Sequence, residues 1–451
     1  MSSDLHTIRV RDMLILCNNL TETPYTILLS PQSTQVHNMS DQTTGGSRRT
    51  SPLDDDDLLG EILLRVPPQP SSLPRVSLVR KRWRRIVSDP WFLRRFCAHH
   101  LKAPLLGFFE HRHLKDFVFN PILESPDHIP PQRFSLGRAL ASMGLGNQLL
   151  LHGCRHGRVI LTDMLSSSSC STVFVCDPVT GCHERLVVPE EFTSLGDYMN
   201  ATAVLCAASQ HGYVHGACRS SPFKVILVYM ARKDGRPLVC IYSSETGMWE
   251  NIIRHGDHQC TIVEISSTLI AHSLYWKILY GHDEEHDEDF VPKPGVLKFN
   301  LERQSLVVLK GPPIGHFGCS KIIKTVDEGV GLATLSDGTM QLQVWHSNVN
   351  CHDIATWVLF KTVDLYNIFG LWKHVSRRGG ILGYDEDGGI LFIYVDSSLF
   401  LLDLDSMQFK RHYYSIERCG LRICHPFRSF YRPGTATAGV GYDGDDILHD
   451  S

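Results

Sequence analysis

The densest run of metal-ligand side chains lies at residues 281–289, where two histidines are mixed with aspartates and glutamates. These groups could bind a divalent metal, but the run lacks the His-Glu-x-x-His order that sets two imidazoles and a general base on one helix face. A charged loop between strands is the preferred interpretation. His152 and His156, beside Gly153 and Gly157, are typical of turn or core histidines. We therefore expect no metal site.

Fourteen cysteines raise the question of metal or disulfide chemistry. None forms a Cys-x-x-Cys pair, and the closest spacings, at 170, 176 and 182 and at 419 and 424, match no zinc template. No Gly-x-Ser-x-Gly elbow, P-loop or dinucleotide fingerprint occurs, so Cys/His catalysis stays open without a motif in its favour. Neither a secretory leader nor a run of ~20 apolar residues is recognisable. We expect a reduced protein of the cytoplasm or nucleus, with no catalytic residue and no cofactor.

Residues 75–95 are strongly basic, with eight lysines and arginines against the single acid Asp89. Such a run could bind nucleic acid. Because no base-reading motif or stacking array accompanies it, a solvated or partner-facing helix surface is favoured. Over the whole chain, 44 basic residues nearly balance 48 acidic ones, which gives no general attraction to nucleic acid or membrane. We expect neither as a partner.

The elements that must position these residues begin with helices. Four aspartates at 54–57 precede an apolar run in which residues 58, 59, 62, 63 and 66 fall on one helical face. Negative charge favours a helix N-terminus, and the prolines at 67, 68 and 70 end the helix. A second helix is expected with Ser71 or Ser72 as its cap, and a third over residues 81–87. Asp89 and Pro90 then form a further helix start.

Beyond residue 102 the pattern predicts strands, at 172–176, 224–230, 238–242, 295–299, 390–395 and 398–404. Repeats near ~50 residues suit four-stranded propeller blades with variable loops. We therefore predict an all-β domain over residues 104–432, a β-propeller of about six blades, with a pair of β-sandwiches as the alternative. The repeating unit is marked by a polar turn residue at intervals of 66, 57, 46 and 57 residues, at Asp177, Ser243, Asn300, His346 and Asp403.

The two ends of the chain show no sustained period. Residues 1–50 and the acidic tail at 433–451 are expected to be disordered. Translation from Met1 and from Met39 both fit the N-terminal stretch. A chain of 451 residues thus divides into a small helical module and one large β domain.

The segments 52–68 (PLDDDDLLGEILLRVPP) and 72–90 (SLPRVSLVRKRWRRIVSDP) closely resemble an F-box, above all those of the large plant families and of grasses in particular. The match is an ordered one of leucine-rich helix, proline break, valine, tryptophan and Ser-Asp-Pro. The remainder resembles, more weakly, the kelch-like β-propeller domains that follow the F-box in that family.

This resemblance implies an all-α, three-helix F-box module at residues 51–101 that binds a Skp-family adaptor and, through it, a cullin. Arg80 stands where many relatives carry a small residue, and Val66 where leucine is usual. Each matched position would belong either to the module's core or to the contact with the adaptor, and the sequence leaves this assignment open. The matched positions are Leu58, Leu59, Ile62, Leu63, Val66, Leu73, Val76, Val79, Trp83 and Ile86.

The implied function is that of a non-catalytic substrate receptor of an SCF-type ubiquitin ligase, which holds an unknown target protein on its propeller. A rival is a small-molecule or sugar-binding propeller, lectin-like or enzymatic, with an F-box anchor; convergent carboxylates or histidines at the channel mouth would favour it. An F-box protein that works outside the ligase is a third possibility. Tryptophan at blade spacing is more often core than surface, but five are candidates for target contacts, Trp249, Trp276, Trp345, Trp357 and Trp372.

Overall fold

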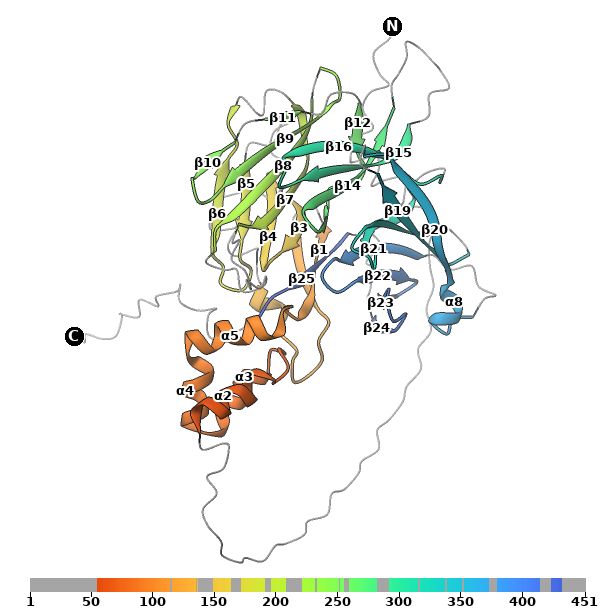
Figure 1. Ribbon diagram of the computed structural model, residues 1–451. Coiled ribbons are helices and arrows are strands. Elements are labelled where there is room, and N and C mark those ends of the chain that lie inside the picture. The colour runs from red at the N-terminus through yellow and green to blue at the C-terminus, as the bar shows by residue number, and fades with distance from the viewer. Residues whose placement is uncertain are drawn as a thin grey trace, which may run out of the picture.

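In the described part of the chain, four helices precede the first strand and pack together beside a ring of sheets (Figure 1). The computed structural model describes residues 55–113, 116–134, 136, 149–163, 172–190, 196–207, 221–231, 233–250, 252–254, 259–281, 292–314, 317–336, 339–350, 353–372, 379–413 and 423–431. The expected disordered segments at 1–50 and 433–451 therefore lie outside the described residues, as does most of the acidic run at 281–289. Among the described residues, no helix is long and apolar enough to cross a membrane.

We call the four helices the helical module; they are α2 (Asp56–Leu64), α3 (Ser72–Val79), α4 (Lys81–Ser88) and α5 (Pro90–His100). Asp55 caps α2, because its carboxylate accepts hydrogen bonds from the backbone N–H groups of residues 57 and 58. Asp89 caps α5 by accepting from the N–H of Trp91, with Pro90 in the first turn as predicted. Ser71 stands at the N-cap of α3, but its side chain makes no capping bond. Its N–H instead donates to Asp127, at 2.9 Å.

The described strands form six sheets, numbered here as blades in chain order. Blade 1 combines β1 (Leu105–His113) and β2 (Asp116–Pro121) with the last strand, β25 (Cys424–Arg428). Blade 2 contains β3 (Leu149–Arg155), β4 (Arg158–Asp163), β5 (Thr172–Cys176) and β6 (His183–Val187). Blade 3 contains β7 (Gly196–Cys206), β8 (Phe223–Ala231), β9 (Pro237–Ser243), β10 (Met248–Trp249) and β11 (Ile253–Arg254).

The other three blades repeat this antiparallel pattern. Blade 4 contains β12 (Cys260–Ile262), β13 (Thr268–Ile270), β14 (Ser273–Tyr280), β15 (Lys293–Asn300) and β16 (Ser305–Lys310). Blade 5 contains β17 (Cys319–Lys324), β18 (Val330–Leu335), β19 (Gln341–Val349) and β20 (Ala355–Asp364), followed by the short helix α8 (Leu365–Ile368). Blade 6 contains β21 (Gly379–Asp385), β22 (Ile390–Val395), β23 (Ser398–Asp403) and β24 (Phe409–Tyr413). A 3₁₀ turn, η2 (Pro131–Phe134), follows blade 1.

The apolar core is divided among the spaces between neighbouring blades. Ile226 and Val228 of β8 face blade 4, whereas Val225 and Leu227 of the same strand face blade 2. Both faces of a blade are therefore buried, which explains why the strands read as apolar runs. Corresponding clusters lie between each other pair of neighbours, including blades 6 and 1. The ring is closed, the predicted six-bladed propeller is confirmed, and the pair of β-sandwiches is excluded.

The predicted turn markers lie where the third strand of a blade leads to the fourth, with one exception. The side chains of Asp177, Asn300 and Asp403 accept backbone N–H bonds two and three residues further on, so each begins an Asx-type turn. The marker at His346 is wrong, because this residue lies inside β19. The corresponding turn of blade 5 has Asn350, whose side-chain oxygen accepts from the N–H of Ile354 at 2.9 Å.

Candidate functional site

The first helix of the module divides its apolar residues between the core and the solvent. Leu59 is fully buried and Leu63 is 2% exposed, and both pack among the other helices. Leu58 and Ile62, one helical turn apart, are 50% and 44% exposed. The predicted single apolar face is therefore two faces, and of the apolar residues of α2 only Leu58 and Ile62 are available to a partner.

The remaining matched positions divide in the same way. Val79 is 56% exposed at the end of α3, next to Leu78, which is 85% exposed and was not among the predicted residues. The others are half-buried against the module's core, namely Val66, Leu73, Val76, Trp83 and Ile86. Arg80 lies between α3 and α4 with extended backbone and an exposed side chain, so it occupies no core space.

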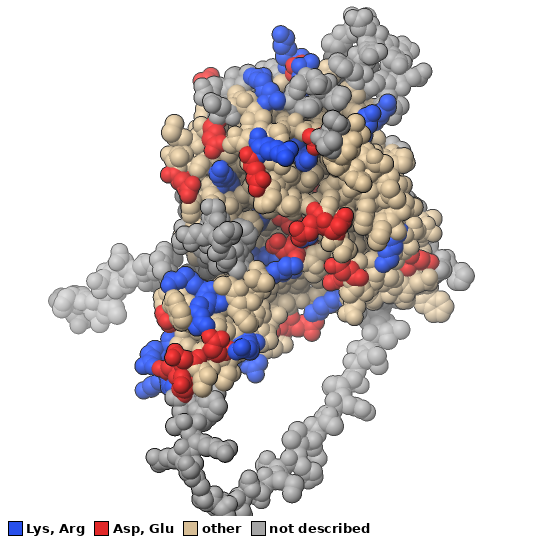
Figure 2. Space-filling view, in the orientation of Figure 1, with Lys and Arg blue, Asp and Glu red and all other residues tan. Residues whose placement is uncertain are grey.

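Ion pairs hold α2 against the basic helices. Asp56 binds Arg82 and Arg85, and Glu61 binds Arg95. The hydrogen bond from Arg82, together with the charges of Arg82 and Arg85, lowers the pKa of Asp56. Figure 2 shows Lys and Arg gathered with Asp and Glu on the helical module. Part of the basic run therefore serves the module's own packing, while its other members are exposed, at Arg75, Arg80, Lys81, Arg84 and Arg94.

The propeller's last residues complete the helical module. Phe430, just after β25, is 6% exposed and belongs to the core cluster of the helices. Arg428 donates a hydrogen bond of 2.6 Å to the carbonyl of Ala103, where the chain passes from α5 to β1. The module and the propeller therefore share a core at this junction.

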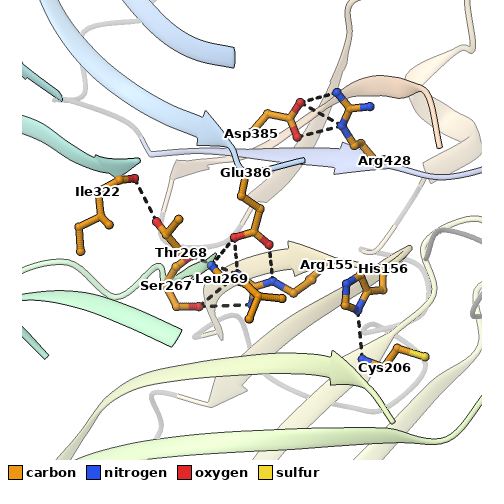
Figure 3. A network of polar contacts seen from close by, with 10 residues as sticks. All are labelled: Arg155, His156, Cys206, Ser267, Thr268, Leu269, Ile322, Asp385, Glu386 and Arg428. Atoms are coloured by element: carbon orange, nitrogen blue, oxygen red, sulfur yellow. Dashed lines mark hydrogen bonds and ion pairs between the residues drawn. The ribbon is translucent and has the colours of Figure 1, made fainter. Parts of the chain in front are cut away.

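A cavity follows the propeller axis and is lined by the innermost strands and their turns. Including its open mouth it has a volume of about 820 Å³. Across it, Glu386 of the β21–β22 turn accepts two hydrogen bonds from Arg155 of β3, at 2.6 and 2.9 Å (Figure 3). Glu386 also accepts from the N–H of Leu269, and Arg155 also donates to Ser267. One ion pair thus joins blades 2, 4 and 6.

Two further ion-pair groups line or back the same cavity. Glu264 lies between Lys277 of blade 4 and Lys321 of blade 5, and Lys277 also donates to the carbonyl of residue 320 at 2.7 Å. Burial lowers the pKa of both lysines to about 8. Arg428 of β25 makes a bidentate pair with Asp385 of β21, with distances of 2.5 to 2.9 Å (Figure 3).

Burial disfavours the charged form of one histidine and several cysteines of the propeller. His152 is 1% exposed, its Nε2 lies 2.8 Å from Thr162 Oγ1, and burial lowers its pKa to about 3. His156 Nδ1 accepts from the N–H of Cys206 (Figure 3). Burial raises the pKa of several thiols to about 12, which keeps them protonated, at Cys176, Cys240 and Cys260. In the part of the chain that the structure describes, no three His, Cys, Asp or Glu side chains are arranged to hold a metal.

The five candidate tryptophans do not form one surface. Trp276 is fully buried between blades 3 and 4, so it is unavailable to a target, and its prediction as a target contact is wrong. Trp249 packs on Tyr242, and its indole N–H donates to the carbonyl of Val187. Trp345 and Trp357 pack partly against the core between blades 4 and 5. Trp372 is 77% exposed.

Sequence reasoning missed two groups of residues. One is an apolar run on the outer strand β20, where Val358, Leu359 and Phe360 are all at least 42% exposed. The other is the set of channel charges, whose partners come from different blades. The sequence feature that could have indicated them is charge at the end of a strand. Arg155 is the last residue of β3, and an acidic turn follows Tyr384.

The geometry defines the class of this protein as a six-bladed β-propeller joined to a helical module. The family model described as "F-box protein At3g26010-like, beta-propeller" matches residues 132–371, more than half of the chain. The chain belongs to this family of F-box-associated β-propellers. No curated protein matches it.

Some solved structures are distantly similar. A luciferin-regenerating enzyme aligns with a TM-score of 0.31 and 8% identity, over 58% of this chain and 76% of that one. The WD40 domain of SCAP from fission yeast aligns with a TM-score of 0.32 and 11% identity, over 59% of this chain and 54% of that one. An α-L-arabinofuranosidase from Fusarium graminearum aligns with a TM-score of 0.34 and 8% identity, over 60% and 80%.

Proposed function

We propose that this protein is the substrate receptor of an SCF-type cullin–RING ubiquitin ligase and has no catalytic step of its own. The helical module, as an F-box, would bind a Skp-family adaptor and through it a cullin. The propeller would hold a target protein near the ubiquitin-conjugating enzyme, so that catalysis comes from proximity. Membership of an F-box protein family supports the proposal, and such a receptor would work in the cytoplasm or nucleus.

The observation that carries the proposal is the pair Leu58 and Ile62. Both are exposed aliphatic side chains, one helical turn apart, on a helix whose other apolar residues are already buried in the core of the helical module. Full burial of such a side chain stabilises a complex by about 1.5–3 kcal/mol. A pair of this kind fits a partner groove that receives an amphipathic helix.

The test is binding of the full chain to a Skp-family adaptor, compared with a Leu58→Asp/Ile62→Asp variant. Because an unpaired carboxylate is costly to bury, we expect affinity to fall by about 100-fold or more. A Val187→Asp/Val326→Asp variant is the matched control, since these valines are 62% and 79% exposed on the propeller. Circular dichroism and a urea melt check that both variants fold.

Binding lost only in the helical variant supports the ligase role. If the parent chain does not bind the adaptor, the proposed ligase role is ruled out. Adaptor binding without incorporation of a cullin would favour an F-box protein that works outside the ligase.

A further inference from the structure

The exposed faces of α3 and α4 carry positive charge that the helical module does not compensate. Neither helix contains an acidic residue. The side chains of four exposed cations make no ion pair with any described residue, namely Arg75 of α3, Arg80 between the helices, and Lys81 and Arg84 of α4. The charged groups of the central cavity differ, because each cation that lines or backs it among the described residues has a carboxylate within ion-pair distance.

The acidic residues of the helical region are already used within it. Asp56 and Glu61 form ion pairs with other arginines, and Asp55 and Asp89 cap helices. Over residues 55–102, ten lysines and arginines stand against five aspartates and glutamates, a net charge of +5 in a chain whose formal net charge is −4. Positive charge is therefore concentrated on the helices, and an anionic group that compensates the four cations has to come from outside them.

Two apolar side chains lie among these cations. Leu78 is 85% exposed, more than any other large apolar side chain of the described residues, and Val79 is 56% exposed. Leu78 follows Arg75 by three residues on α3, so both lie on the same helix face. Residues 78 to 81 are four consecutive exposed positions that connect α3 to α4. We call this set the α3–α4 surface, made up of Arg75, Leu78, Val79, Arg80, Lys81 and Arg84.

The α3–α4 surface begins beside the first helix of the module. Asp56 of α2, two residues before Leu58, accepts a hydrogen bond of 2.5 Å from Arg82, the residue that follows Lys81. This bond holds the start of α2 against the first turn of α4. The exposed pair Leu58 and Ile62 and the α3–α4 surface are therefore neighbouring parts of one small module.

An acidic protein and a nucleic acid would both complement the four cations. The exposed Leu78 and Val79 favour a protein, because phosphates are bound by polar and cationic groups, and unpaired bases by aromatic rings. The α3–α4 surface contains no aromatic residue, and Trp83 of α4 packs against the module's core. Exposed apolar side chains with a charged rim are typical of protein interfaces.

We propose that the α3–α4 surface extends the docking site for the adaptor and fits an adaptor whose apolar groove has an acidic rim at this position. The inference rests on the proposed function of the helical module. The four cations attract the acidic rim before contact, which raises the association rate and disfavours an adaptor with a basic rim. Leu78 and Val79 act after contact, because their burial slows dissociation.

The test measures association and dissociation rates of the full chain with a Skp-family adaptor, at about 0.05 M and about 0.5 M salt. The charge variant is Arg80→Glu/Lys81→Glu. Negative charge is favourable at the start of a helix, so this variant keeps α4 folded. Its control is Arg185→Glu/Arg303→Glu, which makes the same change in net charge at two exposed positions of the propeller.

We expect the charge variant to lower the association rate about tenfold or more, and its control to change it little. High salt should slow association of the parent more than that of the charge variant, because salt screens the attraction. Leu78→Ala should instead raise the dissociation rate about fivefold or more, whereas Val326→Ala, at a position 79% exposed on the propeller, should leave it unchanged.

The outcomes separate this inference from the proposed function. If the adaptor binds but neither the charge variant nor salt changes the association rate, the inference is overturned and the ligase role stands. Equal losses in the charge variant and its control, or dissociation that Leu78→Ala does not speed up, also overturn it. Duplex DNA or RNA that binds the parent more tightly than the adaptor does, and that the charge variant releases, would assign the surface to nucleic acid. A parent chain that does not bind the adaptor overturns both the inference and the proposed function.

Discussion

Single side chains in the channel join blades that are far apart in the sequence. The side chains of Arg155 and Glu386 are only 8% and 17% exposed, so their ion pair is held in a region of low dielectric constant. Taking one partner away leaves a buried charge without compensation, which costs far more than an exposed pair contributes. These residues therefore fix the relative positions of three blades.

The first prediction concerns this pair. Glu386→Gln should lower the free energy of unfolding by about 3–5 kcal/mol, because Arg155 stays charged and buried without a carboxylate to compensate it. Urea denaturation measures the change. Arg155→Met/Glu386→Gln, which removes both charges, should lose less than the sum of the two single variants. A loss below about 1 kcal/mol for Glu386→Gln would mean that water already compensates the pair.

The second prediction is a pH dependence at Asp387, which lines the central cavity in the turn between β21 and β22. Its pKa is raised above the ordinary value of 3.8, so the folded state binds this proton more tightly than the unfolded state does. Stability from this group is present below pH 3.8 and is lost as pH rises through the raised pKa. Asp387→Asn should therefore be more stable than the parent at pH 7, with a gain that shrinks as the pH falls toward 4. Melting temperatures across this range measure it, and a gain that does not change with pH would show that charge is not the cause.

At the scale of elements, part of the core of the helical module comes from the C-terminal end of the propeller. Phe430 reaches it from the end of the propeller, whereas Phe427, three residues earlier, is buried between blades 1 and 2. Two phenylalanines on one short segment thus serve two different cores.

The third prediction uses this contrast. Phe430→Ala should destabilise the helices, and Phe427→Ala the propeller, each by about 3–5 kcal/mol. Hydrogen exchange resolved along the chain distinguishes them. Amides of α2–α5 should exchange faster in the first variant, and those of blades 1 and 2 in the second. Faster exchange of the helices in both variants would show that the junction unfolds as one unit.

The sequence predicted elements better than contacts. Asp89 with Pro90 marked the start of α5, and apolar runs marked β5 and β22 at their observed bounds, because these signals are local. The sequence could not predict that Leu58 is exposed and Leu59 is buried. Both belong to one apolar stripe of the helix, and which side of the stripe is buried depends on where the neighbouring helices pack. The sequence could not predict the proximity of Arg155, Glu386 and Asp387, because it depends on closure of the ring.

For the whole molecule, closure depends on its last strand. β25 pairs with β1 along five registered positions and supplies the inner wall of blade 1. Without it, the clusters between blade 1 and its two neighbours lose Phe427 and Cys424. Blade 1 is therefore complete only when β25, from the end of the propeller, pairs with β1, from its beginning.

The fourth prediction follows from this closure. A chain that ends at residue 422 lacks β25 and Phe430 and should lose both the protease resistance of the propeller and the proposed adaptor binding by the helices. A chain that ends at residue 432 keeps every described contact and should behave as the parent does. Limited proteolysis and size-exclusion chromatography compare the two. A compact, resistant chain ending at 422 would show that blade 1 closes without its inner strand.

The shared core at Phe430 has a consequence for synthesis on the ribosome. The helices emerge first, but the residue that fills their core emerges only after all six blades have been translated. An unfinished chain therefore carries an incomplete helical module together with an open ring. If the helices join a ligase as we propose, a chain gains that ability only at the end of translation, and truncated receptors would not occupy the ligase without holding a target.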